Sequence, residues 1–152
     1  MKIRLLFICF MICCSTILYS QNMYTLDFIN GLDNKQQAVF GDAVKLIVLD
    51  MGKQTTNFSR DLAILNEQNN IAAGYTLNEN ALLRKGTLAR LVARYLDLSG
   101  SFMYNIFGTE RYAYRACVAA GIMTSNGSEW DIVSGEELLE IMRRTAEVGG
   151  VN

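Results

Sequence analysis

The chain has 152 residues and a formal net charge of −1, and it contains neither histidine nor proline. The lack of histidine removes the commonest general base and the commonest metal ligand, so we expect neither a metal site nor another cofactor. A near-neutral chain without a run of basic residues also argues against nucleic-acid binding, which needs clustered lysine and arginine.

Residues 1–20 have the layout of a secretory signal peptide. Lys2 and Arg4 precede an almost unbroken apolar stretch over residues 5–18, and Ser20 is a small residue ahead of polar sequence. The apolar stretch is short for a membrane span. We therefore expect export to the periplasm or the cell surface, after which about 132 residues remain, enough for one domain.

Cleavage after Ser20 would change the chemistry of the chain. It removes three of the four cysteines (Cys9, Cys13 and Cys14) together with two basic residues, which leaves 12 basic and 15 acidic residues and a net charge of −3. No internal disulfide could then form. Lipid attachment at Cys13 or Cys14 stays an alternative, although neither follows the small residue usual at such sites. The remaining Cys117 is expected to be a small buried side chain; exposed, it would permit a disulfide-linked dimer.

The rest of the chain is predicted to be all-α. Residues 21–38 are interpreted as an N-terminal arm that docks either on its own domain or on a partner, residues 39–149 as a helical domain and residues 150–152 as a tail. Apolar residues recur at helical spacing in five segments, and strand signals are weak throughout. The five expected helices are Val39–Met51, Phe58–Gln68, Arg84–Leu96, Thr109–Ala120 and Ser134–Glu147.

Glycines and one cap pattern mark the expected helix ends. Gly52 and Gly121 are placed to end the first and fourth helices. Ser134 and Glu137 have the spacing of a reciprocal capping box at the start of the fifth helix.

Two stretches of the domain resemble each other. Residues 62–91 and 111–141 each run helix, polar loop, helix, which is the pattern of a small repeat that buries its core against its neighbour. No third copy is apparent in the sequence. The second helix of the first stretch opens with Lys85, Gly86, Leu88 and Ala89, and that of the second opens with Ser134, Glu137 and Leu138.

These openings resemble the S-layer homology module, a helix–loop–helix repeat of exported bacterial proteins. The resemblance covers about residues 58–146. It implies a compact helical repeat in which the opening residues of the second helix help to bind a cell-wall polysaccharide. It also implies that three modules commonly act together.

Arginine and tyrosine residues of the fourth helix form the first candidate site. Arg111 and Arg115 lie one turn apart with Tyr112 and Tyr114 beside them, so this face could clamp a carboxylate or stack a sugar ring. The alternative is that Tyr112 packs inside while the arginines pair with Glu110 or face solvent.

Two further features could bind a partner. The local concentration of basic residues formed by Arg84, Lys85, Arg90 and Arg94 could meet an acidic polymer, or it could be a solvated helix face. Trp130 lies in a predicted loop, where an exposed indole would anchor a sugar or a protein, whereas a buried one would pack between the fourth and fifth helices.

Three glutamates cluster at the start of the fifth helix. Glu136, Glu137 and Glu140, with Asp131, could serve acid–base chemistry across a groove, although negative charge in a first helical turn is favourable without any catalytic role.

The sequence favours a non-catalytic exported bacterial module that binds a protein partner or a cell-envelope polymer. A structural subunit of a larger periplasmic or surface assembly and a carboxylate-dependent polysaccharide enzyme are the alternatives.

Overall fold

The computed structural model describes residues 25–67, 78–98 and 109–150. Within these residues the protein is all-α, as predicted, and the only β-type pairings are two isolated bridges. The predicted signal peptide, with Cys13 and Cys14, lies outside the described residues. None of the helices described is long and apolar enough to cross a membrane.

Five helices correspond to the five predicted segments, with boundaries that differ by one or two residues. They are α2 (Phe40–Asp50), α3 (Phe58–Glu67), α4 (Lys85–Tyr95), α6 (Glu110–Ala119) and α7 (Gly135–Gly149). Gly52 and Gly121 follow α2 and α6 with φ angles of 68° and 73°, the left-handed conformation in which glycine ends helices. Helix α7 continues two residues beyond its predicted end because no such glycine turn stops it at Glu147.

Only one of the two hydrogen bonds of the expected capping box forms at the start of α7. The Ser134 hydroxyl accepts from the Glu137 amide at 3.1 Å, as predicted. The Glu137 carboxylate pairs with Lys85 Nζ at 2.8 Å rather than returning to the amide of Ser134. An ion pair from a neighbouring helix therefore takes the place of the local contact.

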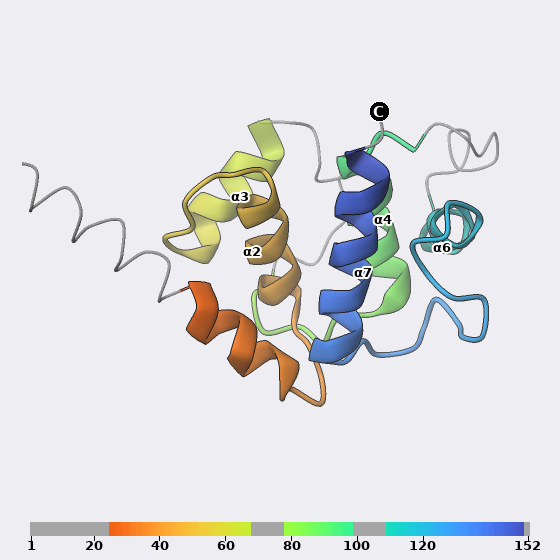
Figure 1. Cartoon of the computed structure of the whole chain (residues 1–152), viewed down its shortest axis with the longest axis horizontal. Helices are drawn as coiled ribbons and strands as arrows, with labels where there is room; N and C mark the ends of the chain where they lie inside the picture. The colour runs from red at the N-terminus through yellow and green to blue at the C-terminus, as the bar shows by residue number, and fades with distance from the viewer. Residues whose placement is uncertain (1–24, 68–77, 99–108, 151–152) are drawn as a thin grey trace, which may run out of the picture.

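The segment interpreted as an arm is part of the packed domain. Residues 25–33 are helical and form the orange helix of Figure 1. Leu32 is only 2% exposed and belongs to the same core as the other helices, and Lys45 Nζ of α2 lies 3.9 Å from the centre of the Phe28 ring. The helical domain therefore begins within the predicted arm.

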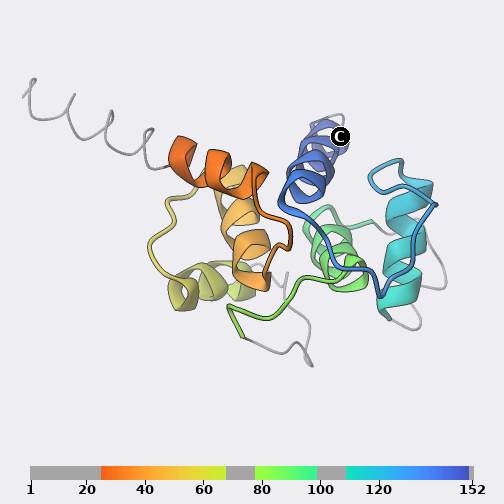
Figure 2. The same cartoon turned by 90° about the horizontal axis from the view of Figure 1, so that it is seen from below.

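The helices described by the structure form three consecutive pairs, which we call units. The helix of residues 25–33 precedes α2, α3 precedes α4, and α6 precedes α7. Helices α2, α4 and α7 run in the same direction side by side, and the other three helices lie around them (Figures 1 and 2). The first unit is the copy that the sequence does not reveal.

A closed ring of three backbone hydrogen bonds joins the units where α2, α4 and α7 begin. Ala38 N donates to Val133 O at 2.8 Å, Val133 N to Leu83 O at 2.9 Å, and Leu83 N to Ala38 O at 3.0 Å. All three residues are completely buried. Each unit thus supplies one extended residue to the ring, which relates the three units by an approximate threefold arrangement.

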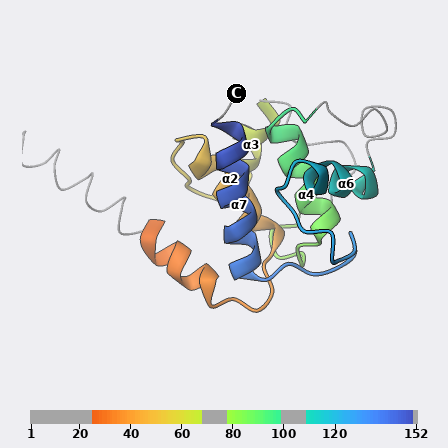
Figure 3. The same ribbon diagram turned by 45° about the vertical axis from the view of Figure 1, so that its right-hand side comes forward.

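Each first helix packs on the preceding unit. Helix α3 packs on α2 and α6 packs on α4, as Figure 3 shows for α4 and α6. The first unit closes the circle, because Gly135 N at the start of α7 donates to Lys35 O at 2.8 Å. The core fills the space between the parallel helices; its most deeply buried members include Val44, Ile47, Leu88, Leu91 and Leu138.

A substitution at Gly135 tests the close contact between the start of α7 and the first unit. A Cβ at this position would lie 1.7 Å from the Leu32 carbonyl oxygen, so we expect Gly135→Ala to lower the free energy of unfolding by at least about 1–3 kcal/mol, the usual cost of overpacking. Urea denaturation measures the change. Gly31→Ala is the control, because a Cβ there meets nothing within 4 Å and alanine favours a helix by about 0.5–1 kcal/mol. Equal stability of the two variants would contradict the close contact.

Candidate functional site

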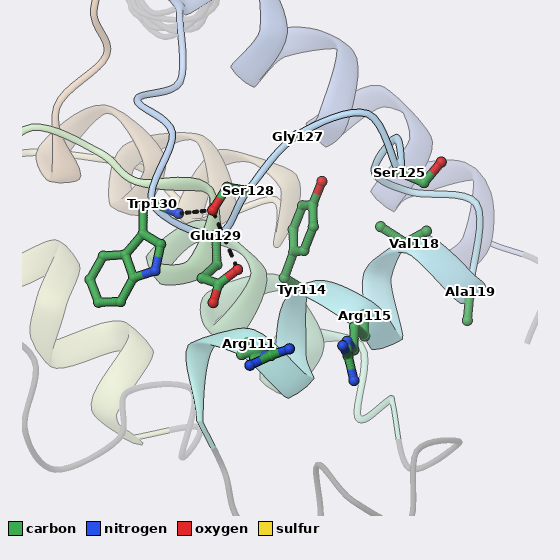
Figure 4. A pocket seen from close by; sticks show the side chains of 10 residues that line it. All are labelled: Arg111, Tyr114, Arg115, Val118, Ala119, Ser125, Gly127, Ser128, Glu129 and Trp130. Carbon is green, nitrogen blue, oxygen red and sulfur yellow. Dashed lines mark hydrogen bonds between the residues drawn. The ribbon is translucent and has the colours of Figure 1, made fainter.

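A groove of about 610 Å³ separates helix α6 from the loop that leads to α7 (Figure 4). Helix α6 supplies one wall, and loop residues 125–130 supply the other. The lining side chains carry cations, a carboxylate, hydroxyls and aromatic rings; they are Arg111, Tyr114, Arg115, Val118, Ala119, Ser125, Gly127, Ser128, Glu129 and Trp130. Four of the predicted binding residues, Arg111, Tyr114, Arg115 and Trp130, therefore lie in one place.

Helix α6 directs its two arginines and its tyrosine differently. Arg111 and Arg115 are exposed one turn apart, as predicted. Tyr114 is only 7% exposed, and its hydroxyl donates to the Thr124 carbonyl at 2.6 Å, so its ring forms the floor of the groove. Tyr112, which the alternative interpretation packs inside, is only half-buried, and Tyr114 is the aromatic that packs inside.

Trp130 is exposed and is not packed between the fourth and fifth predicted helices, so its indole is available to a ligand. Its side chain is 62% exposed at the rim of the groove. Arg84, the residue before α4, places its guanidinium carbon 5.3 Å from the centre of the indole ring. This cation–π contact supports one face of the ring from a different unit.

Hydrogen bonds within the loop hold Trp130 and its neighbours. Ser128 N donates to Asp131 Oδ2 at 2.8 Å, and Asp131 N donates back to Ser128 O at 3.1 Å. Trp130 N donates to the Ser128 hydroxyl at 3.3 Å, and that hydroxyl lies 3.5 Å from Glu129 Oε2 (Figure 4). The loop is a compact turn closed by an aspartate, which favours a formed binding surface.

Lys85 does not face the groove as a ligand-binding cation. Its side chain is 13% exposed and pairs with Glu137. Burial lowers the pKa of Lys85, but the hydrogen bond and charge of Glu137, with the electrostatic interactions of Tyr114 and Asp131, outweigh it and raise that pKa. The ammonium therefore stays charged and is paired within the chain.

The basic residues that were predicted to lie together are spread along α4. Arg84 lies at the start of the helix beside Trp130, whereas Arg94 lies in its last turn. Ten residues of helix separate them by about 15 Å. With Lys85 turned inward, these residues form no single basic patch.

Two of the three carboxylates at the start of α7, Glu137 and Glu140, are engaged by cations. Glu140 contacts Arg143 and Arg144 at 2.8 Å, and these hydrogen bonds lower its pKa to about 2. A general acid needs the opposite shift. Glu137 pairs with Lys85, whose ammonium also interacts with Asp131 of the loop, so a cation lies between these two carboxylates. Within the described residues, no three potential metal-ligating side chains gather.

Apart from Trp130, sequence reasoning missed the loop side of the groove. No apolar periodicity predicts which way the side chains at residues 127–129 point. Their position depends on contacts with α4, which is distant in the sequence. The Asn126–Gly127 pair signals a turn, and the spacing of Ser128 and Asp131 suits a side-chain-closed turn. These signals predict the turn, but they do not predict that it packs beside α4 and faces α6.

A second cavity of about 430 Å³ lies at the C-terminal ends of α2, α4 and α7. Tyr95 donates its hydroxyl to Asp50 Oδ2 there at 2.6 Å, and burial together with that contact raises the pKa of Tyr95 to about 12. None of the predicted binding residues lines it. The groove beside α6 is therefore the stronger candidate.

Comparison with protein-family models, with curated proteins and with solved structures gives no match.

Cys117 is buried, as predicted, and its reactivity tests the packing behind the groove. The residue is fully buried, its thiol lies 3.5 Å from the Ala89 carbonyl oxygen, and burial raises its pKa to about 12. We expect Cys117 to resist alkylation by iodoacetamide at pH 8 in the native protein and to react in denaturant, since the thiolate is the nucleophile. Peptide mapping by mass spectrometry follows this residue separately from the other cysteines. Rapid native labelling of Cys117 would contradict its burial.

Proposed function

We propose that this protein is a non-catalytic, exported bacterial binding module that holds an acidic cell-envelope polysaccharide in the groove beside α6. One observation carries the proposal: the exposed Trp130 ring stands at the rim of a groove whose opposite wall presents the exposed guanidinium groups of Arg111 and Arg115. An aromatic platform and a pair of cations are the two kinds of group that such a polymer needs.

The chemistry of the groove favours a sugar that carries a negative charge. The indole face of Trp130 can stack on the apolar face of a sugar ring. Arginine offers planar, paired donors that match carboxylate or phosphate oxygens. Glu129 and the hydroxyls of Ser125 and Ser128 can accept from or donate to sugar hydroxyls. A neutral polymer would leave the arginines without a partner from the ligand.

The arrangement of the three units supports the envelope assignment. The resemblance to the S-layer homology module implies a repeat in which three modules commonly act together, and the described helices form three pairs joined by a ring of hydrogen bonds, a number consistent with that resemblance. The signal-peptide pattern of residues 1–20 supports export.

The engagement of the acidic residues supports a binding role rather than catalysis. Glu137 and Glu140 each pair with a cation of the chain itself, and the pKa of Glu140 is lowered rather than raised. The groove contains the carboxylate of Glu129, yet the side chains around it suit binding of a charged ligand rather than proton transfer between two carboxylates.

Calorimetric titration with polygalacturonate, a carboxylate-bearing polysaccharide, tests the proposal. We expect Trp130→Ala to weaken binding by about 30-fold, because an anchoring aromatic contributes about 2 kcal/mol. Leu26→Ala is the matched control, since Leu26 is another large exposed apolar residue, 57% exposed, on the distant helix 25–33. Equal weakening by the two substitutions would contradict a role of the indole.

The charged half of the proposal has its own comparison. We expect Arg111→Gln and Arg115→Gln each to weaken polygalacturonate binding at least about tenfold, with the loss shrinking as salt rises, because charge-assisted hydrogen bonds contribute about 1.5–3 kcal/mol. Arg143→Gln removes an exposed arginine from α7 and should leave binding unchanged. Binding of neutral dextran as tightly as polygalacturonate would contradict the acidic ligand. Binding of neither, with capture of an envelope protein instead, would replace the polysaccharide by a protein partner.

A further inference from the structure

Lys85 lies beneath the loop that carries Trp130. As the first residue of α4, it donates its backbone N–H to Asp131 O at 2.9 Å, and the next amide, Gly86 N, donates to Glu129 O at 2.8 Å. The start of α4 therefore binds the loop on both sides of Trp130 through the main chain.

The side chain of Lys85 adds a second connection at Gly127. A Cβ on Gly127 would lie 2.8 Å from Asp131 Oδ2, 2.9 Å from Lys85 Nζ and 3.5 Å from the Tyr114 hydroxyl oxygen. Polar groups from α4, from α6 and from the loop itself therefore gather against one glycine. The loop can approach them this closely only because residue 127 has no side chain.

Charge complementarity explains why a lysine stands at this junction. The ammonium has Glu137 Oε1 at 2.8 Å on one side, and the Asp131 carboxylate interacts with it across Gly127. Asp131 in turn accepts from Ser128 N and so closes the turn that holds Trp130. With the ammonium removed, the Glu137 and Asp131 carboxylates would be left without the cation that lies between them, and their mutual repulsion is unfavourable.

We propose that Lys85 is a positioning residue for the groove: its ammonium, between Glu137 and Asp131, fixes loop residues 124–131 so that Trp130 is held in place before any ligand arrives. The resemblance to the S-layer homology module would instead give Lys85 direct contact with a polymer. The consequence for ligand binding rests on the proposed function, whereas the order of the loop does not.

Amide hydrogen exchange in the full-length, ligand-free protein tests the proposal. We expect Lys85→Met to speed exchange of the Ser128 and Asp131 amides at least tenfold while core amides such as that of Val44 keep their rates. Lys85→Arg should restore slow exchange, because a guanidinium can pair with both carboxylates. Unchanged exchange at Ser128 in Lys85→Met, or equal acceleration in loop and core, would overturn the proposal.

Lys35→Met is the matched control. Lys35 forms a different ion pair, within the first unit, with Nζ 2.6 Å from Asp42 Oδ2 in the first turn of α2. The substitution removes the same charge from an ion pair that does not involve loop residues 124–131, and we expect no change at Ser128 or Asp131. Acceleration there equal to that in Lys85→Met would overturn a specific role of Lys85.

Gly127→Ala approaches the same junction from the loop and serves if Lys85→Met fails to fold. The added methyl group would displace the ammonium or the Asp131 carboxylate, and we expect the same local acceleration at Ser128. Exchange as slow as in the wild type would overturn the proposal.

Titration with polygalacturonate separates this inference from the proposed function. If the wild type binds, we expect Lys85→Met to bind more weakly and Lys85→Arg to recover. Unweakened binding by Lys85→Met would overturn the positioning role. Loosening of the loop in Lys85→Met, together with no binding by the wild type, would support the positioning role and refute the proposed function.

Discussion

The structure depends on the ring of backbone hydrogen bonds among Ala38, Leu83 and Val133. These residues precede the three parallel helices and are completely buried, so their amides and carbonyls have no access to water. A buried backbone group without a partner costs about 1–3 kcal/mol. In an all-helical protein no sheet is available to supply partners, and the ring satisfies one donor and one acceptor of each residue.

The ring also determines where the groove lies. Val133 is bound to Leu83, so the residues that precede Val133 must run beside the start of α4. That path brings Trp130 against Arg84 and places Gly127 over Lys85. Helix α6 packs on α4 and completes the opposite wall with Arg111 and Arg115. The candidate site is thus a consequence of how two units meet.

Local sequence signals predicted the helices but not the way in which they meet. The apolar spacing identified α2, α3, α4, α6 and α7, and the glycines after α2 and α6 marked their ends because each adopts a left-handed conformation. The first unit escaped detection because its first helix, residues 25–33, was interpreted as an arm; in addition, Val39 occupies the place of a polar cap residue at the start of α2. There Asp42 accepts from the Val39 amide at 2.8 Å and caps the helix without a serine or threonine.

The candidate site was predictable only in part, for the same reason. Arg111, Arg115 and Trp130 stood out by residue type, but exposure of Trp130 follows from the path of its loop, which no periodicity encodes. Tyr112 and Tyr114 lie two residues apart on α6, and apolar spacing alone did not show that Tyr114 is the more deeply buried of the two. Lys85 carries a charge that could bind an acidic ligand. Its ammonium pairs instead with Glu137, 52 residues further along the chain, and the sequence alone does not reveal this contact.

Amide hydrogen exchange at Ala38, Leu83 and Val133 tests the central claim most directly. If the closed ring holds the three units together, these amides exchange only when the whole domain unfolds, at the slow rates of buried helical amides such as that of Val44. Exchange of any of the three at the rate of an exposed loop amide, while Val44 stays protected, would show that the units are held together by their side chains alone and would contradict the account.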